Sequence, residues 1–312
     1  MFPHRARRRS DRPSRGRPLG HAAAASVLLL GATVAGTAYV TGRTHDAGAL
    51  VSSPAAPGAT EATVDVAAAT SAPGPDGLLA EAVGDIAVEA GARVSVAVLD
   101  TESGHGAVYG DGAFDTASIV KVDILASLLL RAQDAGRGLT AQEKSYAGTM
   151  IRDSDNASAT ALWKAIGGKQ GLAEANERFG LTGTEGGDGP LWGLTQTTAA
   201  DQLTLLGQVF GDEGGSVLDK DSRRYLRGLM EDIATGQDWG VSAAGPTGFA
   251  LKNGWLPRSS TGLWDINSVG RVVVDGRGYL VAVLSDGNST KAGGISLVEA
   301  ASKAAVSVLA RA

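Results

Sequence analysis

Segments with the pattern of β-strands lie at both ends of the C-terminal three quarters of the chain and enclose a helical middle. "RVSVAVLD" alternates apolar and polar residues as a half-buried strand does, and "GHGAVYG" pairs with it across the turn "TESG". Three further strand patterns come only after the helical middle, and the turn "DGRG" joins the last two of them. The strands are predicted at 93–100, 104–110, 247–255, 262–274 and 277–287.

The segments between and around these strands have the apolar spacing of amphipathic helices. Helices are predicted at 77–91, 118–134, 140–166, 170–179, 197–210, 220–233 and 293–310. When strands precede and follow a helical region in the sequence, they are expected to pair in one antiparallel sheet. We therefore predict an α+β fold of two lobes, in which terminal helices flank the sheet and an all-helical lobe is inserted.

The first 43 residues have the pattern of an export segment. Seven arginines fall within "RARRRSDRPSRGR", and the almost uncharged run "AAAASVLLLGATVAGTAYV" follows. A basic head before an apolar run predicts a signal peptide, cleaved after Ala38, or an uncleaved anchor. The length of the run favours the anchor, and its flanking arginines would keep the N-terminus in the cytoplasm. The protein is thus expected to be extracytoplasmic, either membrane-anchored or secreted.

Residues 44–75 are rich in Ala, Pro, Ser, Thr and Gly and poor in aromatic residues. Such a composition cannot bury enough apolar surface to order a chain, so we predict a disordered linker. The globular domain is expected to span 76–312.

Composition excludes several classes of function. The chain has no cysteine, which removes disulfides, thiol catalysis and a lipid-modified cysteine anchor. His105 is the one histidine after residue 45, so only one imidazole is available for a metal site or for a Ser-His-Asp triad in this part of the chain. The chain after residue 20 has a net charge of about −11, which disfavours nucleic-acid binding. No metal or organic cofactor is implied.

Ser118 and Lys121 lie three positions apart at the head of the apolar run "DTASIVKVDILASLLL". On a helix they share one face, so the amine can lie within hydrogen-bond reach of the hydroxyl and act as its base. The pair alone is a weak signal, because two polar residues on an ordinary amphipathic helix would look the same.

Two further triplets follow in the same chain. "RDSDNASAT" holds Ser154-Asp155-Asn156, and "FALKNGW" holds Lys252-Asn253-Gly254 on a predicted strand. Taken singly, the first could be a helix cap and Lys252 a charge that protects an edge strand. Together and in this order, the three motifs resemble the S-x-x-K, S-D-N and K-T-G motifs of active-site serine penicillin-recognising enzymes, class A β-lactamases in particular. The resemblance covers nearly all of residues 77–312.

The resemblance implies a role for each matching residue. Ser118 would be the acylated nucleophile and Lys121 its base, while Ser154 would relay a proton to the leaving nitrogen. Asn156 would bind the substrate amide and Lys121. On the substrate side, Lys252 would hold a carboxylate with Asn253 beside it, and the backbone N–H groups of Ser118 and Trp255 would form the oxyanion hole.

The chain departs from the family pattern in three places. Asn253 stands where the family has Thr, which alters the expected carboxylate site. The loop "LTGTEGGDGPLWGLTQTT" lacks the family's E-x-x-L-N motif, whose Glu activates the deacylating water, and leaves only Glu185 or Asp188 for that role. Ser118 and Ser154 are only 36 positions apart, so the segment that walls one side of the cleft is expected to be missing.

These observations predict an exported serine hydrolase that forms an acyl-enzyme with β-lactams or acyl-D-Ala-D-Ala peptides and releases it slowly. The alternatives are a penicillin-binding D,D-peptidase-like enzyme, a catalytically silent domain that faces the cell wall, and a generic esterase. The expected partners are a small-molecule β-lactam or a cell-wall peptide, and the membrane through the N-terminal segment. No nucleic acid is expected, and the protein is expected to be a monomer.

Overall fold

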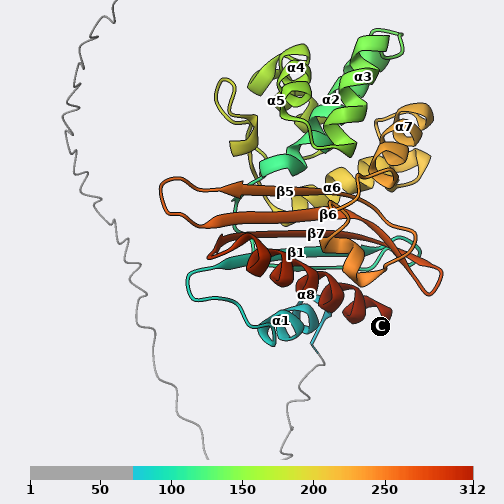
Figure 1. The fold of residues 1–312 in the computed structure, drawn as a ribbon. Coiled ribbons are helices and arrows are strands. Elements are labelled where there is room, and N and C mark those ends of the chain that lie inside the picture. The colour runs from blue at the N-terminus through green and yellow to red at the C-terminus, as the bar shows by residue number, and fades with distance from the viewer. Residues whose placement is uncertain (1–72, 312) are drawn as a thin grey trace, which may run out of the picture. The chain divides into compact units, whose positions relative to one another are not determined.

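The computed structural model describes residues 73–311, in which five strands form one antiparallel sheet of order β2-β1-β7-β6-β5 (Figure 1). Both predicted hairpins are present, because β1 pairs with β2 and β6 pairs with β7. β5 lies at one edge of the sheet. The strands are β1 (Arg93–Asp100), β2 (Gly106–Tyr109), β5 (Ala250–Pro257), β6 (Trp264–Val274) and β7 (Arg277–Asn288).

The two faces of the sheet are both buried, and they pack against different layers. In the central strand β7, Leu280 and Leu284 belong to the core under the helical lobe, whereas Val281 and Val283 belong to the core under the terminal helices. Successive side chains of a strand point to opposite faces, so a continuous apolar run such as "YLVAVL" fits a strand covered on both sides. The fold therefore has the predicted α+β architecture.

The terminal helices α1 (Pro75–Gly84) and α8 (Lys291–Ala310) pack together against one face of the sheet (Figure 1). α1 ends at Gly84, earlier than the predicted helix 77–91, because Gly84 and Asp85 are poor helix formers and the chain then turns back toward β1. α8 is long and apolar enough to cross a membrane, but its buried side chains contact the sheet, as in the core helix of a globular domain.

The helical lobe lies on the other face of the sheet (Figure 1). The helix predicted over 140–166 is wrong as a single element: Asp153, Ser154 and Asp155 interrupt it. Ser154 has φ +58°, and the Asp155 side chain accepts a 2.7 Å hydrogen bond from the Ser158 N–H, so a new helix begins there. The helices of the lobe are α2 (Val120–Asp134), α3 (Ala141–Arg152), α4 (Asn156–Ile166), α5 (Gly168–Phe179), α6 (Ala199–Phe210) and α7 (Lys220–Glu231).

Short elements complete the described chain. The two-residue strands pair with each other, and each of the four 3-10 turns lies in a connection. They are β3 (Phe114–Asp115), β4 (Gln196–Thr197), η1 (Ala117–Ile119), η2 (Trp192–Leu194), η3 (Glu213–Gly215) and η4 (Gly240–Ala244).

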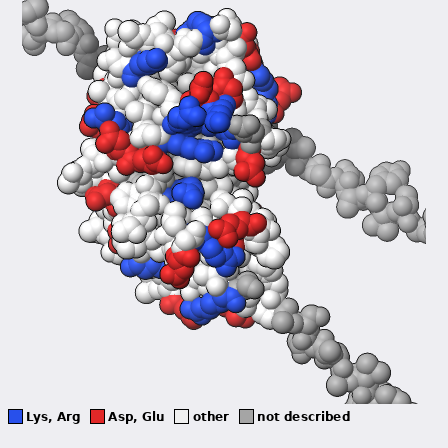
Figure 2. Space-filling model, turned by 90° about the vertical axis from the view of Figure 1, so that its right-hand side faces the viewer, with Lys and Arg blue, Asp and Glu red and all other residues white. Residues whose placement is uncertain are grey.

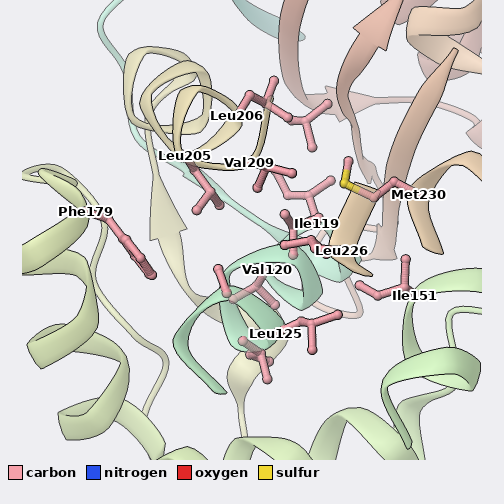
Figure 3. Packing of buried hydrophobic residues seen from close by; sticks show 14 of the residues in the cluster. Ile119, Val120, Leu125, Ile151, Phe179, Leu205, Leu206, Val209, Leu226 and Met230 are labelled. Atoms are coloured by element: carbon pink, nitrogen blue, oxygen red, sulfur yellow. The ribbon is translucent and has the colours of Figure 1, made fainter. Parts of the chain in front are cut away.

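α2 is buried on nearly all sides and forms the centre of the lobe. It packs against α3, α4, α5 and α7, and Figure 3 shows Val120 and Leu125 in the buried cluster at its N-terminal part. A helix that is apolar all round is expected only where neighbours surround it. This packing fixes the N-terminal end of α2, where Lys121 lies, and the turn just before it, which carries Ser118. The other labelled members of this cluster are Ile119, Ile151, Phe179, Leu205, Leu206, Val209, Leu226 and Met230.

The side of the molecule on which α7 lies carries a concentration of positive charge. Figure 2 shows Lys and Arg side chains gathered near the middle of that face. A cavity of about 370 Å³ beside α7 is lined by both basic and acidic side chains: Lys220, Arg223, Arg224, Arg227, Asp212 and Glu231. Arg223 and Arg227 both donate to the Gly211 carbonyl just after α6, so these arginines stabilise the end of that helix.

The predicted export segment, residues 1–43, lies outside the described residues, as does almost all of the predicted linker 44–75. The predicted domain boundary at residue 76 lies within one residue of the start of α1 at Pro75.

Candidate active site

Ser118 lies in η1, the tight turn that leads into α2. The preceding residue, Ala117, has φ +47°, a conformation that non-glycine residues rarely adopt. The Thr116 N–H donates to the Thr195 carbonyl over 2.8 Å and holds the turn in place. The Ser118 side chain remains partly accessible, whereas the apolar residues on both sides of it are buried. The turn therefore exposes the Ser118 hydroxyl, while the neighbouring side chains are buried. A strained backbone, such as the positive φ of Ala117, is found most often at functional sites.

Lys121 lies beneath this hydroxyl and is fully buried. Its Nζ lies 3.0 Å from Ser118 Oγ and donates to the Ser154 carbonyl over 2.6 Å and to Asn156 Oδ1 over 2.8 Å. Ser154 Oγ is 3.1 Å from the same nitrogen. The structure thus brings four of the sequence-predicted residues to one point. Ser154 comes from the break between α3 and α4, and Asn156 is the first residue of α4.

Burial lowers the pKa of Lys121 from 10.5 to about 7, and the nearby Asp155 carboxylate opposes this shift. The Ser154 carbonyl and the Asn156 Oδ1 can only accept hydrogen bonds, so a neutral amine would direct its two N–H groups at them. Its lone pair would then face the Ser118 hydroxyl. The contacts around Lys121 fit a base that can take the hydroxyl proton near neutral pH.

Ser154 and Lys252 continue the network away from Ser118. Lys252 is fully buried and donates to Ser154 Oγ over 3.1 Å and to the Asn253 carbonyl over 2.9 Å. Burial and the proximity of Lys121 lower the pKa of Lys252 well below its usual value. Because Ser154 Oγ can accept from both lysines, its own proton is free to be donated elsewhere. That geometry fits a proton relay.

The edge strand β5 passes directly beside the nucleophile. A Cβ on Gly254 would lie 2.7 Å from the Thr116 carbonyl oxygen and 2.9 Å from the Ser118 nitrogen, so only glycine permits this approach. Trp255 follows on the same edge, with its ring on the opposite side of the strand from Lys252, against Trp239 and under the Lys291 amine. Its contribution at the cleft would therefore come from its backbone.

Asn253 does not join the cluster. It lies on the other face of β5, is fully buried, and donates from Nδ2 to the Gln237 and Trp239 carbonyls over 2.8 and 2.9 Å. Strand alternation places it there, because Lys252 already occupies the cleft side. The predicted role of Asn253 beside a substrate carboxylate finds no support in this arrangement, in which the side chain fixes the loop before η4.

Glu185 and Asp188 also lie apart from the cluster. Their carboxylates bind the Lys169 amine over 2.8 and 3.0 Å and are 74% and 88% exposed. Within the described residues, neither has a hydrogen bond to Ser118 or Lys121. The role of deacylating base predicted for Glu185 finds no support in this arrangement.

Trp192 is the site residue that the sequence did not predict. Its ring centroid lies 5.0 Å from Lys121 Nζ, and its Nε1 donates to Thr160 Oγ1 over 3.1 Å. The only signal in the sequence is an aromatic residue in the glycine-rich stretch "GGDGPLWGL", which by itself indicates no contact with Lys121. The contact arises because η2 packs against η1.

The family model of the "Beta-lactamase enzyme family" (Beta-lactamase2) matches residues 137–309, which is more than half of the chain. The protein belongs to the Beta-lactamase enzyme family. The match includes Ser154, Asn156 and Lys252.

Among curated proteins, the chain is similar to "Putative lipoprotein LppW" of Mycobacterium tuberculosis and of Mycobacterium bovis, with 28% identity over 179 residues. The match covers 55% of this chain and 57% of the relative, so the chain spans little more than half the length of the curated relatives it matches.

Solved structures of other proteins share the fold at low identity. A class A β-lactamase from Bacteroides cellulosilyticus matches with a TM-score of 0.65 and 18% identity, over 76% of this chain and 99% of the other. A point mutant of PBP-A, solved as an acyl-enzyme complex with penicillin G, matches with a TM-score of 0.63 and 20% identity, over 75% and 97% of the two chains. TLA-1 extended-spectrum β-lactamase matches with a TM-score of 0.67 and 16% identity, over 76% and 99%. These matches establish the class A β-lactamase fold.

Proposed function

We propose that this family member is a serine hydrolase that becomes acylated on Ser118 by β-lactams or by related acyl-D-Ala-D-Ala peptides. The observation that carries the proposal is the contact between Lys121 Nζ and Ser118 Oγ over 3.0 Å, at an amine whose pKa burial lowers to about 7. A serine hydroxyl at its ordinary pKa is a poor nucleophile and needs a base that is neutral at the working pH.

In the proposed acylation, Ser118 Oγ attacks the substrate carbonyl carbon while its proton passes to Lys121 Nζ. The carbonyl oxygen becomes negatively charged, and the backbone N–H groups of Ser118 and Trp255 would stabilise it. The C–N bond then breaks, and Ser154 Oγ gives its proton to the leaving nitrogen. Lys121 and Lys252 both contact Ser154 Oγ, so either can return a proton to it.

Substrate binding is proposed to depend on charge and on Asn156. Lys252 is buried beside Ser154, and a substrate carboxylate near it would favour its ammonium form. Asn156 Oδ1 binds Lys121, which leaves the amide Nδ2 to donate to a substrate carbonyl. Asn253 has no part in this scheme.

Release of the acyl group is proposed to be slow. Both acidic residues of the 183–195 loop bind Lys169 and are largely exposed, so neither is in position to activate water at the ester. A stable acyl-enzyme is the behaviour of a penicillin-binding protein, so this placement favours the penicillin-binding, D,D-peptidase-like alternative over rapid turnover of β-lactams.

The N-terminal segment is proposed to export the protein and to tether the domain outside the cytoplasm. The basic and apolar pattern of residues 1–43 supports this, as does the word "lipoprotein" in the name of the mycobacterial relatives. The 312 residues contain no cysteine, so the tether would be the apolar segment and not a lipidated thiol. A monomer is proposed.

Labelling with a fluorescent penicillin tests the function. The full-length chain in mild detergent is expected to give a band that survives denaturing electrophoresis, whereas Ser118→Ala is expected to give none. Pre-incubation with a thioester that ends in D-Ala should block the label if the site accepts cell-wall peptides. A folded protein that takes no label would favour the silent domain instead, and hydrolysis of simple uncharged esters without labelling would favour a generic esterase.

A further inference from the structure

The indole of Trp192 forms one wall around the Lys121 amine. Its ring centroid lies 5.0 Å from Nζ, within the range of a cation–π contact. The residue is fixed at two points, because Nε1 donates to Thr160 Oγ1 over 3.1 Å and the backbone carbonyl accepts from Thr195 Oγ1 over 2.7 Å. Thr160 is one helical turn after Asn156, so the same face of α4 holds both the Lys121 amide ligand and the indole.

Access to the two reacting groups differs. Ser118 is partly exposed, whereas Lys121 has no exposed surface. The polar neighbours of the amine, Ser118, Ser154 and Asn156, all accept hydrogen bonds from it, and the Trp192 ring covers it from the η2 side. A substrate can therefore reach the hydroxyl, while bulk water does not reach the amine.

We propose that Trp192 excludes the hydrolytic water from Lys121 and thereby makes the acyl-enzyme long-lived. This inference rests on the proposed acylation of Ser118. Hydrolysis needs a water molecule beside the neutral Nζ: the water oxygen attacks the ester carbonyl carbon and its proton passes to the lysine lone pair. The bond from that carbon to Ser118 Oγ then breaks, and the proton returns to Ser118 Oγ. The indole takes the space that this water needs.

Three carboxylates of the surrounding segments are already engaged. Glu185 and Asp188 are bound to Lys169, and the Asp155 side chain caps α4. None of these three offers a water at the ester a second base in place of Lys121.

The test compares Trp192→Ala, Trp192→Phe and the wild-type full-length chain after acylation with benzylpenicillin. Intact mass gives the rate at which the adduct forms and, after excess drug is removed, the rate at which it disappears. In Trp192→Ala the adduct is expected to disappear at least about tenfold faster, because a base-assisted water is admitted. That gain should increase as the pH rises and Lys121 loses its proton. Trp192→Phe keeps a ring and should keep a long-lived adduct.

Two further variants separate shielding from a general disturbance of the loop. Leu191→Ala removes an adjacent side chain that is 52% exposed, and it should leave the adduct lifetime unchanged. Thr160→Val removes the hydrogen-bond acceptor of the indole but leaves the ring, and it should shorten the lifetime less than Trp192→Ala does. If Trp192→Ala does not fold, the adduct lifetime in Thr160→Val tests the inference in its place, and a lifetime shorter than in wild type supports it.

Three outcomes would overturn the inference: equal lifetimes in wild type and Trp192→Ala, an equally short lifetime in Trp192→Phe, or no change in Thr160→Val when Trp192→Ala is unfolded. Failure of the proposed function looks different, because the wild-type chain would then form no adduct at all.

Discussion

At the scale of single residues, the site depends on what burial does to the charges on α2. Lys121 and Asp123 lie two positions apart on this helix, and both are completely buried. Burial disfavours the charged form of each, so it lowers the pKa of the lysine and raises that of the aspartic acid, in both cases to about 7. The two shifts have different consequences, because one group faces Ser118 and the other faces the interior of the lobe.

The lowered pKa of Lys121 predicts the pH dependence of acylation. The amine is a base only when neutral, so the acylation rate should rise with pH through about 7 and level off above it. Rapid-quench mass spectrometry with benzylpenicillin between pH 5.5 and 9 measures this rate. A rate that is flat over that range would show that Lys121 is not the base. Lys121→Ala should acylate at least about a hundredfold more slowly at every pH.

The raised pKa of Asp123 predicts an effect on stability. The folded state holds a proton that the unfolded state releases above about pH 4, so the stabilising contribution is complete below that pH and is lost as the pH rises through about 7. Asp123→Asn cannot ionise and should therefore gain stability over wild type as the pH increases from 5 to 8, by on the order of 3 kcal/mol at most. Urea unfolding at the two pH values measures the difference, and an equal difference at both would contradict it.

At the scale of elements, α3 and α4 each begin with a side-chain N-cap, but only the cap of α4 lies beside the Ser118 site. Thr140 and Glu143 form a capping box at the start of α3, and Asp155 caps α4 beside the site. Asp155→Ala should cost about 1 kcal/mol of stability and also slow acylation, because Ser154 and Asn156 would lose their placement around Lys121.

Thr140→Ala is the matched control for this prediction. It removes an N-cap of similar strength about 15 positions earlier and should cost a similar free energy of unfolding without a change in acylation. Chemical denaturation and the rate of fluorescent penicillin labelling are measured on both variants. Equal labelling rates in the two variants would show that the cap of α4 does not position the site.

The contact between β5 and η1 depends on Gly254. A Cβ there would lie under 3 Å from the Thr116 carbonyl oxygen and from the Ser118 nitrogen. Both are backbone atoms, so no side-chain rotation can relieve the clash. Gly254→Ala should displace the strand from the nucleophile and slow acylation by about a hundredfold. Gly228→Ala is the control, because its Cβ would meet nothing within 4 Å and alanine favours the helix. Labelling at or near the wild-type rate in Gly254→Ala would contradict the prediction.

At the scale of the whole molecule, the sequence predicted the architecture because the strands and helices have clear periods. The run "YLVAVL" lies in the predicted strand 277–287 and the spacing of 118–134 predicts a helix, and the structure has β7 and α2 there. The break at Ser154 was not predictable from period alone, because apolar spacing continues across it. It is visible only through the Asp155 cap and the positive φ of Ser154.

The chemistry was predicted less evenly. The structure brings together Ser118, Lys121, Ser154, Asn156 and Lys252, because two of the motifs lie where a helix begins and the third lies on β5, which passes beside Ser118. The side chain of Asn253 lies on the other face of β5, which the sequence motif does not reveal, because a motif says nothing about which face of a strand each side chain takes. Trp192 was missed because its contact with Lys121 depends on how two loops pack, and loop packing leaves no periodic signal in the sequence.

The proposed function requires that Ser118 forms an ester with a β-lactam carbonyl and that this ester is hydrolysed slowly. The most direct measurement is the intact mass of the full-length chain over time with benzylpenicillin, beside Ser118→Ala. The wild-type chain is expected to gain a single penicilloyl group that persists for hours after the free drug is removed, and Ser118→Ala is expected to gain no mass. If a folded wild-type chain never gains this mass, or if Ser118→Ala gains it equally, Ser118 is not the acylated residue.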